Sequence, residues 1–162
     1  MGNGTTRKRV IKYTEVKKKM ATKKERTRSY PIKTIEGINK VHAGKLARVD
    51  IKTTGALLKH SITRRDREEL AKKAGISKKL ILEWANLSDL LRIKGVGEEY
   101  SDMLEEVGVD TVKELKMRNV GNLHPAIKNY CDKSRLVRKA PSQKQVASWI
   151  TQAKVMKPML KY

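Results

Sequence analysis

The sequence predicts an all-α protein, and three observations support this class. No alternating run of polar and apolar residues is long enough to build a sheet. Several segments instead place apolar residues at helical spacing, after Ser or Thr and before Gly, which are residues that cap helices. A stretch of 24 residues also recurs 58 positions later without a gap. We therefore expect a helical domain over residues 30–162 and a separate basic tail before it.

The charge of the chain predicts a polyanionic partner. Its 162 residues include 38 Lys and Arg against 17 Asp and Glu, a net charge of +21. Such an excess favours nucleic acid first and an anionic membrane surface second. No apolar run reaches about 18 residues and no apolar segment follows the basic N-terminus, so we expect neither a membrane span nor a signal peptide. The expected location is intracellular, in the cytoplasm or in an organelle lumen that contains nucleic acid. Cys131 is the single cysteine, which excludes an intramolecular disulfide and a Cys-based zinc cluster.

Charge is distributed unevenly along the chain. Residues 1–29 contain 11 basic and 2 acidic residues, and residues 30–84 contain 13 and 6. Residues 85–115 reverse the sign with 3 basic and 8 acidic residues, and residues 116–162 contain 11 and 1. One acidic block therefore interrupts a basic chain.

Residues 1–29 are expected to form an extended basic arm. They lack a sustained apolar period and cannot bury enough surface to offset the entropy of ordering. In isolation the arm should be disordered, and on a nucleic acid it should lie along the phosphates; a solvated charge run that only aids solubility is the alternative. The arm cations expected to contact phosphate are Arg7, Lys8, Arg9, Lys12, Lys17, Lys18, Lys19, Lys23, Lys24, Arg26 and Arg28.

A duplicated unit is the strongest signal in the chain, with copies at about 35–58 and 93–115. The segment "IEGINKVHAGKLARVDIKTTGALL" aligns with "IKGVGEEYSDMLEEVGVDTVKELK", which pairs Gly37 with Gly95. Each copy is typical of a helix end, a glycine turn, a helix, a short loop, a Thr cap and a second helix. Such internal duplication usually means one supersecondary unit packed against its copy.

Further helices are predicted by local signals around the two copies. Thr63 can cap a helix that ends near Gly75, and Ser77 can cap the next. Pro125 is expected near the start of another helical stretch, and Pro141-Ser142 come directly before the last one. The two tryptophans, Trp84 and Trp149, lie on the apolar faces of these helices and are expected in the core.

The duplicated residues resemble a known motif. Gly95-Val96-Gly97, followed by Leu104 and Val107-Gly108-Val109, resembles the helix-hairpin-helix motif, and its duplication resembles a tandem pair. From about Tyr30 onward, the order "RIKGVG", "GVDTVKEL", "NLH" and "VASWITQAK" is similar to a family of tandem helix-hairpin-helix domains of uncharacterised function. This resemblance implies sequence-independent binding of nucleic-acid backbone, and it allows a monovalent cation on the carbonyls of the Gly95–Gly97 hairpin. No other cofactor is expected.

The two hairpin turns differ in charge. Glu98 and Glu99 follow the second glycine of the later copy, where they suit the helix dipole but repel a phosphate. In the earlier copy Asn39 replaces that glycine, and asparagine tolerates a left-handed turn better than most residues. Glycines in such turns let backbone N–H groups face a phosphate at a helix N-terminus. We expect the first copy to bind phosphate and residues 98–106 to be a structural partner or a docking site for a basic protein.

Catalysis is not expected. Some helix-hairpin-helix repair enzymes use a Lys and an Asp beyond the hairpin, but no Lys is specified opposite Asp110, and Asp110 or Thr111 more simply caps the next helix. His42, His60 and His124 lack ligand spacing, so no metal site is expected. No phosphate-loop signature or nucleophile set indicates a small-molecule substrate.

An architectural nucleic-acid binder is therefore the leading hypothesis, with electrostatic contacts to the backbone. A long Lys/Arg arm on a small helical body favours a ribosomal or ribosome-associated rRNA-binding component. A DNA-binding chromatin or nucleoid protein is the alternative, and an adaptor for a basic protein is the competitor from another class. The body cations expected to contact phosphate are Lys40, Lys45, Arg48, Arg64, Arg65, Arg135, Arg138 and Lys139.

Overall fold

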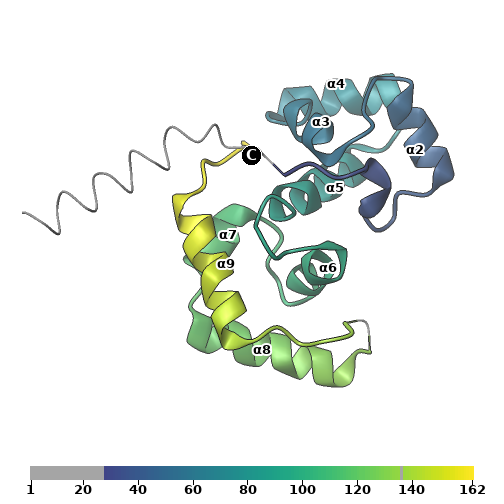
Figure 1. The fold of residues 1–162 in the computed structure, drawn as a ribbon. Coiled ribbons are helices and arrows are strands. Elements are labelled where there is room, and N and C mark those ends of the chain that lie inside the picture. Colours follow the sequence, from purple (N-terminus) through teal and green to yellow (C-terminus); the bar gives the residue numbers. More distant parts are fainter. Residues whose placement is uncertain (1–27, 136) are drawn as a thin grey trace, which may run out of the picture.

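The computed structural model describes residues 28–135 and 137–162 (Figure 1). Over these residues the chain forms eight α-helices, one short 3₁₀ helix and no strand, so the predicted all-α class is confirmed. The expected arm lies outside the described residues apart from Arg28 and Ser29. The elements are η1 (Ile32–Thr34), α2 (Lys40–Ala47), α3 (Thr54–Lys59), α4 (Arg64–Ala74), α5 (Lys78–Leu90), α6 (Glu98–Glu106), α7 (Val112–Met117), α8 (Val120–Lys133) and α9 (Gln143–Val155).

The helices form two successive sets in the same order. The short helices α2 and α3 begin 58 residues before α6 and α7. Longer helices follow each pair, α4 and α5 in the first half of the molecule (η1 to α5) and α8 and α9 in the second half (α6 to α9). Helix α5 packs against α3 and α4, and α9 packs in the same way against α7 and α8. Figure 1 shows the first half at the upper right and most of the second half at the lower left. Helix α5 of the first half and α6 of the second half contact each other where the two halves meet.

Equivalent backbone positions in the two halves have nearly equal conformations. Gly37 and Gly95 have φ values of 82° and 93°, in the left-handed region that favours glycine. Thr53 and Thr111 both N-cap the following helix at φ −136° and ψ 158°. The sequence similarity at the 58-residue offset thus follows from shared backbone requirements as well as shared apolar positions.

Asn39 has a different role from the one the sequence predicted. Its backbone is extended, with φ −76° and ψ 177°, so the left-handed conformation expected for it is wrong. Its side chain accepts a hydrogen bond from the backbone N–H of His42 at 2.9 Å and thereby N-caps α2. Gly97, at the equivalent place, is also extended and has no side chain to cap α6. The turn of the first copy therefore does not require a glycine at position 39. A side-chain cap of this kind stabilises a helix by about 1 kcal/mol.

Most predicted helix starts are correct, and one is wrong. Thr63, Ser77 and Ser142 N-cap α4, α5 and α9, as expected. Pro125 does not begin a helix, because α8 starts five residues earlier at Val120 and contains the proline in its interior. A proline there removes one intrahelical hydrogen bond, which the surrounding packing of α8 against α9 has to offset.

Each half has its own hydrophobic core with a tryptophan at its centre. Trp84 and Trp149 are 0% and 1% exposed, so their predicted core positions are confirmed. The rings of His42 and Trp84 meet edge to face with centroids 5.0 Å apart, and those of Tyr100 and Trp149 lie 5.1 Å apart. His42 and Tyr100 are themselves 58 residues apart. In each half a tryptophan from a longer helix, Trp84 of α5 or Trp149 of α9, therefore lies against the glycine turn.

Replacing Gly95 by alanine is expected to destabilise the protein more than replacing Gly97. At Gly95 the backbone is left-handed and a Cβ atom would lie 3.0 Å from the indole nitrogen of Trp149. The left-handed conformation alone costs an alanine about 1–2 kcal/mol. At Gly97 the backbone is extended and a Cβ atom would meet nothing within 4 Å, so we expect a loss below about 1 kcal/mol. Urea unfolding of Gly95→Ala and Gly97→Ala measures the difference; equal losses would contradict this account of the turn.

Candidate nucleic-acid interface

The predicted phosphate-contacting cations are only partly described by the structure. The ten from Arg7 to Arg26 lie outside the described residues, and Arg28 stands at the base of the arm. The other eight occupy three separate places. They lie on or at the end of α2 (Lys40, Lys45, Arg48), in the first turn of α4 (Arg64, Arg65) and in the connection between α8 and α9 (Arg135, Arg138, Lys139).

A side-chain hydrogen bond links α2 to the turn between α4 and α5. Lys45 Nζ donates to the carbonyl of Gly75 at 2.9 Å. Four more lysines lie within four residues of Gly75, and all four are exposed. The sequence alone did not single them out, because 30 residues separate Lys45 from Gly75 and only the fold brings them together. The resulting set, called here the first-half basic cluster, consists of Lys45, Lys72, Lys73, Lys78 and Lys79.

Acidic neighbours neutralise part of the charge near this cluster. Arg64 and Arg65 are 81% and 86% exposed, and each pairs with a glutamate four residues later at 3.3 and 3.1 Å. Lys78 lies 3.2 Å from Glu68, and the pKa of Glu68 is lowered, first by its hydrogen bond with Lys78. Exposed pairs of this kind contribute little to stability because the solvent screens them. A phosphate can therefore replace these carboxylates at little cost.

The acidic turn of the second half is partly covered by the chain itself. Tyr100 Oη donates to the carbonyl of Lys139 at 3.0 Å, and Arg138 Nε lies 3.5 Å from Glu99 Oε1. Both basic residues belong to the connection between α8 and α9, residues 134–142, whereas the connection between α4 and α5 has only three residues. Two of the predicted phosphate-contacting cations thus lie beside the acidic start of α6.

Carboxylates also gather where α6 faces the first half. Burial, followed by a hydrogen bond with Glu36, raises the pKa of Asp102 to about 7. Burial, followed by repulsion from Glu83 of α5, raises the pKa of Glu105. These groups resist ionisation first because they are partly buried and second because negative charge is already concentrated there. The same concentration disfavours a phosphate at α6.

A comparison with family models assigns the chain to a family. The model described as "Domain of unknown function (DUF4332)" matches residues 36–156, which is most of the chain and includes every helix from α2 to α9. The chain belongs to the DUF4332 family. The DUF4332 match leaves out residues 1–35, which include the predicted arm, and residues 157–162. Comparisons with curated proteins and with solved structures found no match.

The residues considered for catalysis have structural partners in the DUF4332 domain. Thr111 N-caps α7, and the backbone N–H of Asp110 donates to Glu114 Oε2 at 2.7 Å. Each of the three histidines has a ring nitrogen 2.9–3.3 Å from a backbone carbonyl. Within residues 28–135 and 137–162, no three His, Cys, Asp or Glu side chains are grouped to hold a metal ion. None of the helices described by the structure has the length and apolar character needed to cross a membrane.

The raised pKa of Asp102 predicts that stability falls as the pH rises. The folded protein holds a proton that the unfolded chain releases near pH 4, so the stability present below pH 4 is lost as the pH rises toward about 7. Since Asp102 is only half-buried, we expect Asp102→Asn to raise the free energy of unfolding by about 1–2 kcal/mol at pH 8. At pH 4 the same substitution should have little effect.

Thermal unfolding at pH 4 and pH 8 measures this difference. Glu106→Gln is the matched control, because Glu106 is exposed on the same helix and its substitution should change stability little at either pH. An equal gain from Asp102→Asn at both pH values would contradict the prediction.

Proposed function

We propose that this DUF4332 protein is non-catalytic and binds the phosphate backbone of nucleic acid without reading its sequence. In this proposal α2–α3 and α6–α7 act as two helix-hairpin-helix units, and the first unit holds the phosphate. The observation that carries the proposal is the difference in charge between two equivalent helices. Helix α2 contains two lysines and no acidic residue, whereas α6 contains five acidic residues and no basic one.

The first unit combines two features that favour an anion. The first backbone N–H groups of a helix have no partner within the helix, and the helix dipole adds a partial positive charge there. At α2 the Asn39 side chain caps only the N–H of His42, and Lys40, the first residue of the helix, is exposed. The first-half basic cluster lies near the C-terminal end of the same helix, where Lys45 donates its hydrogen bond to Gly75. A nucleic-acid backbone that spans both features would contact several phosphates.

RNA is the nucleic acid that we propose, within a ribosome or as a ribosome-associated component. The arm supports this choice, because 11 cations in 29 residues suit a segment that threads between packed RNA helices. DNA in chromatin or a nucleoid is the alternative. Binding measured on an RNA duplex and on a DNA duplex of the same sequence decides between them.

Charge reversal at the first unit tests the proposal. The variant Lys40→Glu/Lys72→Glu/Lys73→Glu should bind a labelled RNA duplex about tenfold more weakly or worse, measured by fluorescence anisotropy at fixed salt. The control Lys128→Glu/Lys144→Glu/Lys154→Glu changes the net charge equally, at exposed positions of the second half. Its loss should be several-fold smaller. Equal losses in both variants would mean that the first unit has no special role.

An adaptor function is the second candidate, and one contact favours it. Arg138 of the chain's own connection already pairs with Glu99 at the start of α6, so this surface accepts a basic side chain. If α6 is only a structural partner, Glu98→Gln/Glu99→Gln should leave nucleic-acid binding unchanged or tighten it. A loss of assembly with a basic protein in this variant, with Lys40 and Lys45 dispensable, would reverse the roles of the two units.

A further inference from the structure

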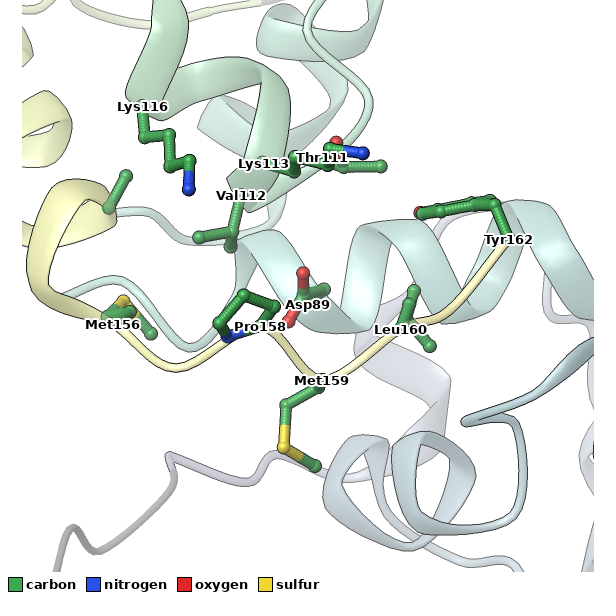
Figure 2. A pocket seen from close by; sticks show the side chains of 11 residues that line it. Asp89, Thr111, Val112, Lys113, Lys116, Met156, Pro158, Met159, Leu160 and Tyr162 are labelled. Carbon is green, nitrogen blue, oxygen red and sulfur yellow. The ribbon is translucent and has the colours of Figure 1, made fainter.

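The residues after α9 turn back and cross the first half of the molecule. This segment, residues 157–162, is called the strap (Figure 2). The backbone N–H of Lys161 donates to the carbonyl of Ile62 at 2.8 Å. Arg67 Nη2 donates to the carbonyl of Lys161 at 3.0 Å, and Tyr162 Oη donates to Asn86 Oδ1 at 2.7 Å. The strap continues from the second half, yet these bonds all end in the first half.

Apolar packing also connects the strap to the first half. Leu160 is 8% exposed and packs in a small cluster of its own with Leu58 of α3 and Ala85 of α5. This cluster is separate from the two cores that contain Trp84 and Trp149. The strap thus inserts a second-half extension between two helices of the first half.

A buried ion pair anchors the start of the strap. Asp89 and Arg92 side chains are only 5% and 4% exposed and are bonded to each other. Arg92 Nη2 donates to the carbonyl of Lys157 at 3.0 Å, and Asp89 also accepts from the backbone N–H of Val112 at the start of α7. Figure 2 shows Asp89 beside Pro158 of the strap and close to Val112 of α7. One buried pair therefore joins α5, α7 and the strap.

We propose that the strap is a clamp that makes the two halves unfold as one body. Each half has its own core and its own tryptophan, so each has what an independently melting unit requires. The direct packing between the halves involves α5 with α6 and the end of α5 with the second core. The strap adds hydrogen bonds and Leu160 to this junction. The proposal does not depend on nucleic-acid binding and is tested without any ligand.

The test follows both halves within the same molecule. In the full chain labelled with 5-fluorotryptophan, Trp84 and Trp149 give separate ¹⁹F signals, assigned with Trp84→Phe and Trp149→Phe. Across a urea series the two signals should show coincident midpoints. In the chain that lacks residues 157–162 the midpoints should separate, because each half then unfolds by itself. Coincident midpoints without the strap, or separate midpoints with it, would overturn the proposal.

Point variants keep the test decisive if the shortened chain does not fold. Leu160→Asp places a charge against Leu58 and Ala85 and should separate the midpoints in the full chain. Lys157→Ala is the control, because Lys157 is exposed and is bonded through its backbone carbonyl alone. It should leave the midpoints coincident. Coincident midpoints in Leu160→Asp, or equal separation in the control, would show that the strap does not couple the halves.

Discussion

Replacing Arg92 by alanine should lower the free energy of unfolding by about 3–5 kcal/mol. The substitution leaves Asp89 without a cation at a position where its side chain is 5% exposed. Burial already raises the pKa of Asp89 despite the hydrogen bond and the charge of Arg92. Arg92→Ala also removes the donor that holds the carbonyl of Lys157. The unfolding midpoint in urea, with its slope, measures the loss.

Two further variants separate the buried pair from a general effect of removing arginine. Arg65→Ala removes an exposed residue paired with Glu69 and should change stability by less than about 1 kcal/mol. Asp89→Leu/Arg92→Met replaces both charges with apolar groups and should recover part of the loss, since buried pairs replaced in this way are often neutral. A loss below about 1 kcal/mol in Arg92→Ala would contradict the assignment of this pair to the junction.

Removing residues 1–27 should weaken binding to an RNA duplex by about 100-fold or more and leave the fold intact. These residues carry 10 of the 38 basic side chains. The structure places the cut before Arg28, because Ser29 Oγ accepts a hydrogen bond from the backbone N–H of Gly55 at 3.1 Å. Tyr30 also exchanges two hydrogen bonds with Thr54.

Circular dichroism and thermal unfolding of the shortened chain check that the fold is intact, and fluorescence anisotropy checks the loss of affinity. Helix content and melting temperature should match those of the full chain, and only the affinity should fall. A shortened chain that fails to fold would refute the division into arm and body. A shortened chain that folds and binds as tightly as before would refute the role of the arm.

Local sequence signals predicted much of the fold. Caps such as Thr63, Ser77 and Thr111 are satisfied within one helical turn, so neighbouring residues suffice to predict them. Pro125 did not predict the correct start of α8. A proline is best tolerated in the first turn of a helix, but this one lies inside α8. Gly37 and Gly95 both have positive φ values, a backbone requirement that the sequence records as glycine.

The features that depend on distant contacts were not predicted. Asp89 lies in the last turn of α5 and Arg92 two residues after the helix ends, a short spacing that gives no sign of burial. Contacts with α7 and the strap, which are distant in the sequence, accompany the burial of this pair. The strap itself has no periodicity that would indicate its place. The first-half basic cluster could not be predicted from the sequence, because it depends on the contact between Lys45 and Gly75, which are 30 residues apart. Of the candidate site, the sequence therefore supplied the charge and the turns, and the fold supplied the grouping.

The dependence of RNA affinity on salt tests the proposed function most directly. The dissociation constant of the full chain for an RNA duplex should be measured from about 50 to 200 mM salt, on two unrelated sequences. If roughly six to ten phosphates are contacted, affinity should fall about 10³- to 10⁵-fold over this range, equally for both sequences. An affinity that stays flat with salt, or that depends strongly on sequence, would contradict backbone binding.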